Sequence, residues 1–525
     1  MVKQHSGQNR WPDPDRVYDA IVVGAGPAGA VGAARLAGSG RSTLLLEAGP
    51  GGVCGPGRWG LVPPRTGIAW YWPPLEETSA DGMGRPSPGL PGRRPVTDYW
   101  AGKGLGGGSA VNGMLLSTGS KADFDRWTEL GCAGWTAEDM APWFDRAIAV
   151  LRPEAAPHPA KGSTEADLVA AFDEAVATWG WAGASASTLD PEVRGLLTPA
   201  LATSGGQRRS VTDAYLPLAD GHDLNVRTGV EVGAVEIDDG RTVGVRLADG
   251  RLVRSSLVVV AAGAVGSPRL LYRSGLRRGV GTLAKNHPAI TLAFPWPGDA
   301  PAGESALAVR RVLRWEVEAV DHPTRGQVGS DSSTHTVQAH LIGPVGTGPS
   351  ASGAVLVTLS DPSSAGWLDG LDTDHPSMVT NRLATADDRV AMREAVRLVF
   401  VLTSEMASNL ADTAPVVAGT AQPDQWSAWI ADAQLASQWD DSSLDRWMDD
   451  HFGSVYHAVG TCRMGPAGTH GCVDPNPETA GSVWGVEGLV VADTSIFPDL
   501  VGGGLQLPAV AVAERVAHGL VAENG

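Results

Sequence analysis

The first fifty residues alternate between apolar runs and small-residue stretches in a way that predicts a βαβ unit. Residues 17–23 form an apolar run of strand length that is rich in β-branched side chains. A glycine-rich turn follows, and the small residues 28–36 then predict a helix that packs closely on a sheet. Residues 42–46 predict a second buried strand that ends at Glu47. This order is typical of a dinucleotide-binding unit of about 30 residues.

The remaining pattern predicts an α/β chain in which strands of this type recur far apart. Residues 120–180 and 384–450 favour helices. Short strands with turns at Asp239-Gly240 and Asp249-Gly250 are expected between residues 224 and 260. Further strands are expected at 257–262, within 290–360 and at 488–492, with a helix at the C-terminal end. Residues 50–95 are so rich in Gly and Pro that a long irregular loop is expected. One domain is therefore assembled from discontinuous pieces.

Composition excludes several classes of protein. The 525 residues carry 58 acidic and 40 basic side chains, a net charge of −18, which does not suit a nucleic-acid binder. No apolar run approaches the roughly 20 residues that cross a bilayer. The polar N-terminus does not resemble a secretory signal, and four cysteines form neither a metal-ligand pattern nor a dense disulfide framework. We expect a cytoplasmic protein.

Gly24, Gly26 and Gly29 give the spacing G-x-G-x-x-G between a strand and a helix. The first glycine permits the tight turn, the second lets the backbone approach a pyrophosphate, and the third lets helix and strand pack. Glu47 ends the next strand, where a carboxylate accepts hydrogen bonds from an adenosine ribose. This motif alone leaves NAD and FAD as alternatives.

Four further motifs resemble the glucose–methanol–choline (GMC) flavin oxidoreductases. They are residues 102–113 with 123–127, residues 263–276, residues 457–465 and residues 488–498. With the glycine fingerprint they follow the family's order along the chain. The resemblance implies a Rossmann-like FAD-binding domain and a substrate domain built on an antiparallel sheet with helices. The expected FAD-binding segments are 17–118, 211–287 and 451–525, and the substrate-binding segments are 119–210 and 288–450.

The resemblance also implies which residues contact FAD. Asn112 is expected at the edge of the flavin ring and Asp493 near the pyrophosphate or ribityl chain. Pro508 is expected at the first position of the terminal helix, whose dipole then stabilises anionic reduced flavin. The remaining implied cofactor contacts are Gly104, Gly107, Ser109, Gly113 and Val232. Valine at position 111, where some choline-oxidising relatives attach FAD through histidine, predicts non-covalent FAD at this site.

His457 occupies the position of the family's catalytic histidine, so it is the expected base for oxidation of an alcohol with hydride transfer to flavin N5. His287, His335 and His340 are weaker candidates, and no catalysis is expected at His287. The family's second catalytic His or Asn falls at Gly504, which has no side chain to orient a hydroxyl. Gln506 either reaches the active site from the start of the helix or faces solvent.

The expected function is FAD-dependent oxidation of a small-molecule alcohol, with oxygen or another compound as electron acceptor. The missing second His or Asn leaves a non-redox lyase, similar to the family's hydroxynitrile lyases, as an alternative. A non-catalytic flavoprotein is a further alternative, which the intact segment around His457 disfavours.

Overall fold

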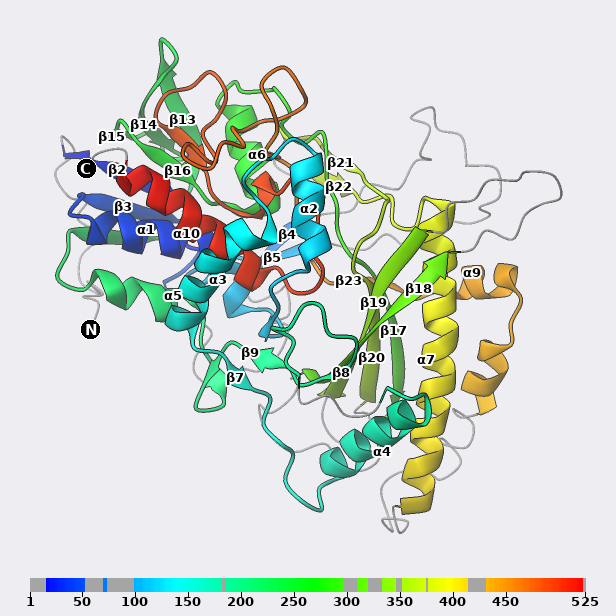
Figure 1. Cartoon of the computed structure of the whole chain (residues 1–525). Coiled ribbons are helices and arrows are strands. Elements are labelled where there is room, and N and C mark those ends of the chain that lie inside the picture. Colours follow the sequence, from blue (N-terminus) through cyan, green and yellow to red (C-terminus); the bar gives the residue numbers. More distant parts are fainter. Residues whose placement is uncertain are drawn as a thin grey trace, which may run out of the picture.

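A computed structural model describes residues 16–51, 69–72, 99–181, 186–296, 309–319, 333–345, 352–373, 376–413 and 431–522. Two large sheets organise these residues, and each has its own apolar core (Figure 1). The predicted α/β fold with a parallel and an antiparallel sheet is confirmed. None of the helices in these ranges is long and apolar enough to cross a membrane.

The first sheet has five strands that are all parallel. Its order is β12 (Leu224–Thr228), β3 (Thr43–Glu47), β2 (Ala20–Val23), β16 (Val258–Val260) and β24 (Leu489–Val491). The predicted strand at 17–23 divides at Asp19. Its first part, β1 (Val17–Tyr18), pairs with β15 (Leu252–Ser255) in a second sheet that also holds β14 (Arg241–Leu247) and β13 (Val232–Asp238).

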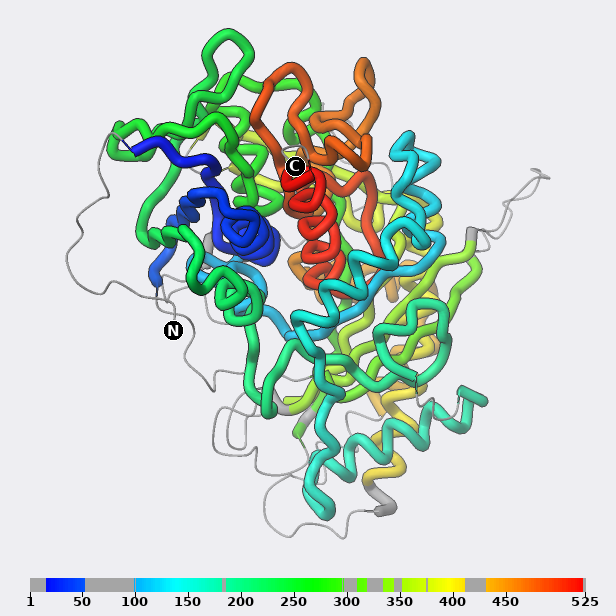
Figure 2. Tube along the Cα trace, turned by 60° about the vertical axis from the view of Figure 1, so that its left-hand side comes forward, coloured from blue at the N-terminus to red at the C-terminus, as the bar shows by residue number. Residues whose placement is uncertain are grey.

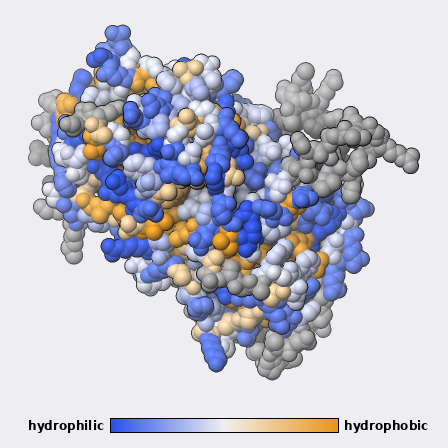
Figure 3. Space-filling view, viewed as in Figure 1, coloured by the Kyte–Doolittle hydropathy of each residue, from blue (hydrophilic) through white to orange (hydrophobic). Residues whose placement is uncertain are grey.

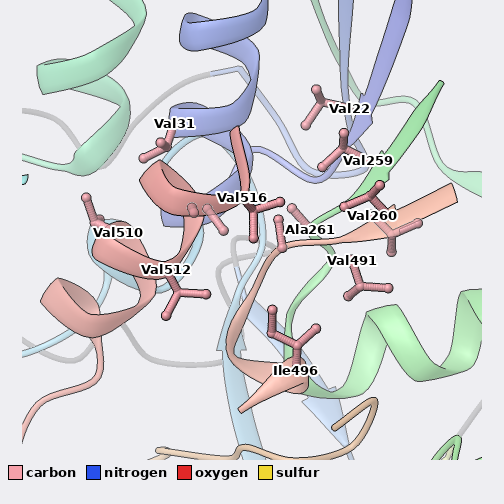
Figure 4. Packing of buried hydrophobic residues seen from close by; sticks show 14 of the residues in the cluster. Val22, Val31, Val259, Val260, Ala261, Val491, Ile496, Val510, Val512 and Val516 are labelled. Carbon is pink, nitrogen blue, oxygen red and sulfur yellow. The ribbon is translucent and has the colours of Figure 1, made fainter. Parts of the chain in front are cut away.

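Helices α1 (Pro27–Gly38) and α10 (Gln506–Ala522) pack on each other beside the parallel sheet (Figure 2). Valines contribute to this core: Val31 of α1 and Val510 of α10 belong to the same apolar cluster as the sheet residues Val22 and Val259 (Figure 4). The small residues of α1 allow this close approach. The two chain segments are almost 480 residues apart, yet the Arg35 guanidinium binds the buried Glu514 carboxylate at 2.6 Å.

The second core lies under a six-stranded antiparallel sheet. Its order is β23 (Phe452–Ser454), β17 (Pro288–Pro295), β20 (Ser352–Leu359), β19 (Ser333–Val345), β18 (Val309–Ala319) and β8 (Gly195–Leu197). The long helix α7 (Ala386–Thr413) covers one face and packs on α4 (Thr164–Thr178) (Figure 1). The other face is turned toward the parallel-sheet part.

Two of the remaining helices begin with a capping box. The Ser120 and Thr136 side chains each form a capping box, at the start of α2 (Lys121–Glu129) and α3 (Ala137–Leu151). The other helical segments are α5 (Val211–Tyr215), α6 (Gly263–Arg273), α9 (Asp441–Asp450), and the 3₁₀ turns η2 (Gly107–Ala110), η3 (Leu216–Ala219) and η5 (Thr494–Ile496). The helices predicted within 120–180 and 384–450 are thus present where the chain is described.

The remaining strands are two or four residues long or form isolated hairpins. They are β4 (Ala69–Trp72), β5 (Tyr99–Gly102), β6 (Leu115–Leu116), β7 (Glu154–Ala155), β9 (Ala200–Leu201), β10 (Thr203–Ser204), β11 (Gln207–Arg208), β21 (Trp367–Asp369) and β22 (Ser377–Val379). Strand β4 lies inside the segment 50–95 that was expected to be irregular, and it pairs with β5. Most of that segment lies outside the described residues. On the face drawn in Figure 3, hydrophilic and apolar residues are interspersed.

The domain bounds expected from the sequence remain a prediction. The segments of the parallel sheet all fall in the pieces assigned to FAD binding. Strand β23 also falls in one of those pieces, at residues 452–454, but it pairs with β17 in the antiparallel sheet. This pairing matters for the site, because it places the chain after β23 beside the chain before β17.

Candidate active site

A cavity of about 470 Å³ lies between the two large sheets. Its walls come from the β2–α1 turn, the loop around η2, the N-terminal parts of α6 and α10, and the antiparallel strands β18, β19 and β20. The cavity therefore meets the carboxyl ends of the parallel strands on one side, where open α/β sheets bind ligands. On the other side it meets the uncovered face of the antiparallel sheet.

The three fingerprint glycines have distinct roles at the β2–α1 turn. Gly24 has a φ of +98°, and a Cβ there would lie 2.4 Å from the Ala261 carbonyl oxygen. A Cβ on Gly29 would lie 1.8 Å from the carbonyl oxygen of Gly24, so helix and turn meet at the backbone. Gly26 lines the cavity with open space where its Cβ would be, and no side chain caps α1 there. The first-turn N–H groups of α1 are thus available to an anion.

The second glycine cluster packs directly against the first. Gly107 has a φ of +48°, and a Cβ on it would lie 2.7 Å from Gly26 Cα. Ser109 lines the cavity, but its hydroxyl already donates to the Gly106 carbonyl and accepts from the Val211 N–H. The predicted contact of Ser109 with a cofactor would therefore be made by its backbone, or by a hydroxyl that also takes part in these two hydrogen bonds.

Glu47 connects the two glycine loops. Its buried carboxylate accepts hydrogen bonds from the N–H groups of Ala25 (2.8 Å), Gly49 (2.7 Å) and Gly104 (3.0 Å). Burial raises the pKa of the Glu47 carboxyl, while the three N–H donors act in the opposite direction. Gly104 is absent from the described cavity lining and acts here as one of these donors. Glu47 itself lines the cavity, where the ribose contact was expected.

Asn112 and Gln506 form a hydrogen-bonded pair in the cavity wall. The Asn112 Oδ1 atom accepts from Met114 N–H and Arg208 Nη1, which fixes the orientation of its amide. The Asn112 Nδ2 atom then donates to Gln506 Oε1 at 2.7 Å. Gln506 is 7% exposed and lines the cavity, so it does not face solvent. Its Nε2 atom is buried without a partner among the described residues and is a donor for a ligand in the cavity.

The other implied cofactor contacts divide into lining and supporting residues. Gly113, Val232 and Asp493 line the cavity. The Asp493 carboxylate also accepts from the N–H groups of Gly263 and Ser495, so it ties α6 to η5. Pro508 is the third residue of α10, because that helix begins at Gln506; the expected first position is wrong. The third residue also lacks an intrahelical N–H bond, so proline is tolerated there for the same reason.

His457 is positioned by the pairing of β17 with β23. Pro288 lies opposite Ser454, so the residues just before β17 lie beside those just after β23. The Asn286 side chain joins these segments, because it accepts from the His457 N–H at 2.8 Å and donates to Ser454 Oγ at 2.9 Å. The Nδ1 atoms of His287 and His457 then lie 3.0 Å apart, and both histidines are partly or fully buried.

The hydrogen-bond partners determine the tautomer of each ring. His287 Nε2 lies 3.0 Å from the Ser360 carbonyl oxygen, which can only accept, so this nitrogen carries a proton. Burial lowers the pKa of His287 to about 4, so its Nδ1 atom bears a lone pair at neutral pH. His457 Nδ1 must therefore donate to His287. Burial also lowers the pKa of His457 well below its usual value, which leaves a lone pair on His457 Nε2.

Gly504 lines the cavity but has no room for a side chain. A Cβ there would lie 2.9 Å from the Leu115 carbonyl oxygen. The loop is held in this place by Ser117, whose Oγ accepts from the Gly504 N–H at 2.7 Å. A His or Asn at position 504 would therefore require the loop to move away from β6. The second catalytic side chain is therefore excluded by the position of the backbone as well as by the glycine in the sequence.

Comparison with known protein families shows which family this chain belongs to. The N-terminal model described as GMC oxidoreductase matches residues 18–289, and the C-terminal model of the same description matches residues 362–513. The chain belongs to the GMC oxidoreductase family. It is therefore an FAD-dependent oxidoreductase by family, and the predicted family membership is confirmed.

Curated GMC relatives align over nearly the whole chain. A 5-(hydroxymethyl)furfural oxidase from Methylovorus sp. (strain MP688) is 28% identical, covering 97% of this chain and 99% of that protein. An oxygen-dependent choline dehydrogenase from Rhizobium rhizogenes is 27% identical, covering 95% and 94%. Among solved structures, formate oxidase from Aspergillus oryzae RIB40 has a TM-score of 0.75 at 19% identity, covering 98% and 99%. A fungal aryl-alcohol oxidase has a TM-score of 0.68 at 18% identity, covering 97% and 99%.

The residues of this GMC chain fit FAD. The open positions at Gly26, Gly108 and Gly113 lie on the cavity wall, where any side chain would fill the space. The first turn of α1 offers N–H groups to a pyrophosphate, and the unpartnered Gln506 Nε2 offers a donor to a ring carbonyl. FAD would supply the hydride acceptor at its N5 atom.

Three of the four cysteines, Cys132, Cys462 and Cys472, are buried free thiols, and Cys54 lies outside the described residues.

Sequence reasoning underrated two histidines of this GMC site. His287 was a weak candidate at which no catalysis was expected, but its ring contacts His457. His340 was ranked as weak, but it lines the cavity. A signal was available for His340, because apolar residues at 337, 339 and 341 alternate with Gln338 and His340, which predicts one polar face on a strand.

Proposed function

We propose that this GMC oxidoreductase oxidises an uncharged alcohol to an aldehyde or ketone with FAD as hydride acceptor, and that His457 is the base. The observation that carries this proposal is the fixed tautomer of His457, whose Nε2 lone pair belongs to a neutral ring in the cavity wall. A neutral imidazole is ready to accept a hydroxyl proton at physiological pH.

His457 would take the proton of the substrate hydroxyl on Nε2 as the carbon–hydrogen bond of the same alcohol breaks. His287 would stabilise the resulting imidazolium, because its Nδ1 lone pair accepts from His457 Nδ1. The Ser360 carbonyl holds His287 in the required orientation at 3.0 Å. This arrangement supports His457 as a base that is oriented by a second ring. General base catalysis typically contributes 10²–10⁴-fold to the rate.

The walls of the cavity favour a substrate without charge. The antiparallel sheet contributes Val309, Ile342 and Leu356, together with His340. Burial lowers the pKa of His340 to about 4, so that ring is also neutral at pH 7. The described acidic lining residues are Glu47, Glu231 and Asp493, all from the parallel-sheet part. An ammonium group at the antiparallel wall would therefore lose its hydration without a carboxylate from that wall.

We also propose that FAD is held without a covalent bond at position 111. Val111 lines the cavity, and its side chain has no nucleophile. Acid precipitation should release the yellow colour into the supernatant. Colour that stays with the protein pellet would contradict this part of the proposal.

The experiment that tests the function is anaerobic mixing of the purified yellow enzyme with a panel of uncharged aliphatic and benzylic alcohols and with choline. Loss of the visible flavin absorbance with an uncharged alcohol, faster than with choline, supports the proposal. Turnover of a cyanohydrin without loss of flavin absorbance would favour the lyase alternative instead. Peroxide formed when air is readmitted would identify oxygen as the electron acceptor.

A further inference from the structure

The site around His457 lacks the family's second catalytic side chain, because the residue at that position is Gly504. Oxidation of an alcohol benefits from a second polar group, which holds the hydroxyl oxygen while the base removes its proton. Gly504 cannot regain a side chain in this backbone, since its Cβ would lie 2.9 Å from the Leu115 carbonyl oxygen. The second group must therefore come from another element.

Several polar side chains line the cavity near His457 but already have partners. Ser454 Oγ accepts from Asn286 Nδ2 and from the Tyr456 N–H. The Tyr99 hydroxyl donates to the Tyr456 carbonyl, and the Thr494 hydroxyl donates to the Ala458 carbonyl. Gln506 has a free Nε2 atom, but its amide is joined to Asn112 in the wall formed by the glycine loop and α10. Among the described residues that line the cavity, the other buried side-chain atom without a hydrogen-bond partner belongs to His340.

His340 lies in the central strand β19, on the wall opposite the glycine loops. Its neighbours Ala339 and Leu341 belong to the apolar core under α7, so alternation turns His340 to the cavity face of the sheet. Val312 and Leu356 lie opposite it on the two flanking strands. His340 is 8% exposed, and its Nε2 atom has no hydrogen-bond partner among the described residues.

An unpaired nitrogen at this depth costs free energy unless a ligand binds it. The sheet holds the ring on a rigid element, which suits a group that must orient a substrate. His340 and His457 line the same cavity, and positive charge on His340 would lower the pKa of His457. Among the described residues of the antiparallel wall, His340 lies beside the apolar lining residues Val309, Ile342 and Leu356, whose side chains offer no hydrogen-bond acceptor to its Nε2 atom.

We propose that His340 is the second catalytic residue of this enzyme and that its Nε2–H donates a hydrogen bond to the substrate oxygen. The substrate O–H proton would pass to His457 Nε2, bound FAD would supply the acceptor for the hydride of the carbinol carbon, and the carbonyl oxygen would form against His340. The bond from His340 strengthens as negative charge develops on this oxygen. This inference rests on the proposed alcohol oxidation.

The test compares His340→Leu, which keeps the volume and removes the donor, with His340→Gln, which keeps an N–H donor. His335→Gln is the matched control, because His335 lies on the same strand but is paired with Asp361 and does not appear in the described cavity lining. All variants are compared at equal FAD content. We expect His340→Leu to lower the rate constant of anaerobic flavin reduction about 10²-fold or more, His340→Gln to recover part of it, and His335→Gln to change it less than threefold.

A second readout does not depend on turnover. The tertiary alcohol 2-phenylpropan-2-ol has no carbinol hydrogen, so its binding can be followed by the change it causes in the oxidised flavin spectrum. We expect His340→Leu to weaken this binding at least fivefold. Unchanged binding, or no binding to the wild type, would overturn the role of His340. If no alcohol reduces the wild-type flavin, the proposed function fails, and this binding comparison still decides whether His340 contacts a hydroxyl.

Discussion

The imidazole rings of His287 and His457 meet through their Nδ1 atoms at 3.0 Å, at an interplanar angle of 82°. Two nitrogens this close share one proton. The Ser360 carbonyl determines which ring donates it, because that carbonyl requires the proton of His287 to be on Nε2. The Ser360 carbonyl thus determines that the lone pair of His457 is on Nε2, the nitrogen that we propose as the base.

Replacing His287 tests this control. His287→Leu removes the acceptor for His457 Nδ1, so the tautomer and orientation of His457 are no longer fixed. We expect the rate constant of flavin reduction to fall by roughly tenfold or more, with the affinity for 2-phenylpropan-2-ol changed less than twofold. Stopped-flow reduction and spectral titration measure the two quantities. A parallel loss of both would point to general damage to the site.

Restoring the family's residue at position 504 should not restore function. Gly504→Asn places a Cβ 2.9 Å from the Leu115 carbonyl oxygen, so the loop or β6 must move. We expect the free energy of unfolding to fall by about 1–3 kcal/mol, with no gain in the reduction rate. Chemical denaturation measures the first quantity. Gly38→Ala, at a helical glycine with open space around it, is the control and should change stability by less than about 1 kcal/mol. A faster enzyme from Gly504→Asn would show that the loop adapts.

Glu47 provides a test of how the two glycine loops are joined. Glu47→Gln replaces a carboxylate that accepts three N–H bonds with an amide whose NH₂ group faces an N–H donor. We expect a loss of about 2 kcal/mol in the free energy of unfolding and at least tenfold weaker FAD binding. Glu487→Gln is the control, since Glu487 is exposed in a pair with Arg241. Equal stability of both variants would contradict the assigned role.

The pH dependence of stability should report on His340. Burial, with charge on Arg314 and His287, lowers the pKa of His340 to about 4, from 6.5, and charge on His340 in turn lowers the pKa of His457. The unfolded chain therefore binds a proton at higher pH than the folded chain, and stability falls as the pH drops from 6.5 toward 4. We expect His340→Leu to lose less stability over this interval than the wild type, by an amount on the order of 3 kcal/mol. Identical slopes in denaturation curves across this pH range would contradict a buried neutral His340.

Local patterns in the sequence predict much of the parallel-sheet part. The turn at Asp239-Gly240 has positive φ at both residues, 45° and 74°, as the Asp-Gly pair indicates. Gly24 and Gly29 have the close contacts that their spacing predicts. The division of residues 17–23 at Asp19 depends on pairing with β15, more than 230 residues away, which no local pattern contains.

The site was less predictable because its parts come from distant segments. His287 and His457 are brought together by the register of β17 with β23, and Gln506 is buried by its bond to Asn112. Alternation at residues 337–341 indicates a polar face on the strand with His340, but this signal was not used and does not show that the face meets the cavity. The family motif indicated His457 directly, since His457 occupies the position of the family's catalytic histidine.

We propose that the neutral His457 removes the hydroxyl proton of an alcohol as the alcohol gives up its hydride. The decisive measurement is the rate constant of anaerobic flavin reduction by one alcohol substrate, for the wild type and for His457→Ala at equal FAD content. We expect a fall of 10²–10⁴-fold for the variant. An unchanged rate constant would contradict it.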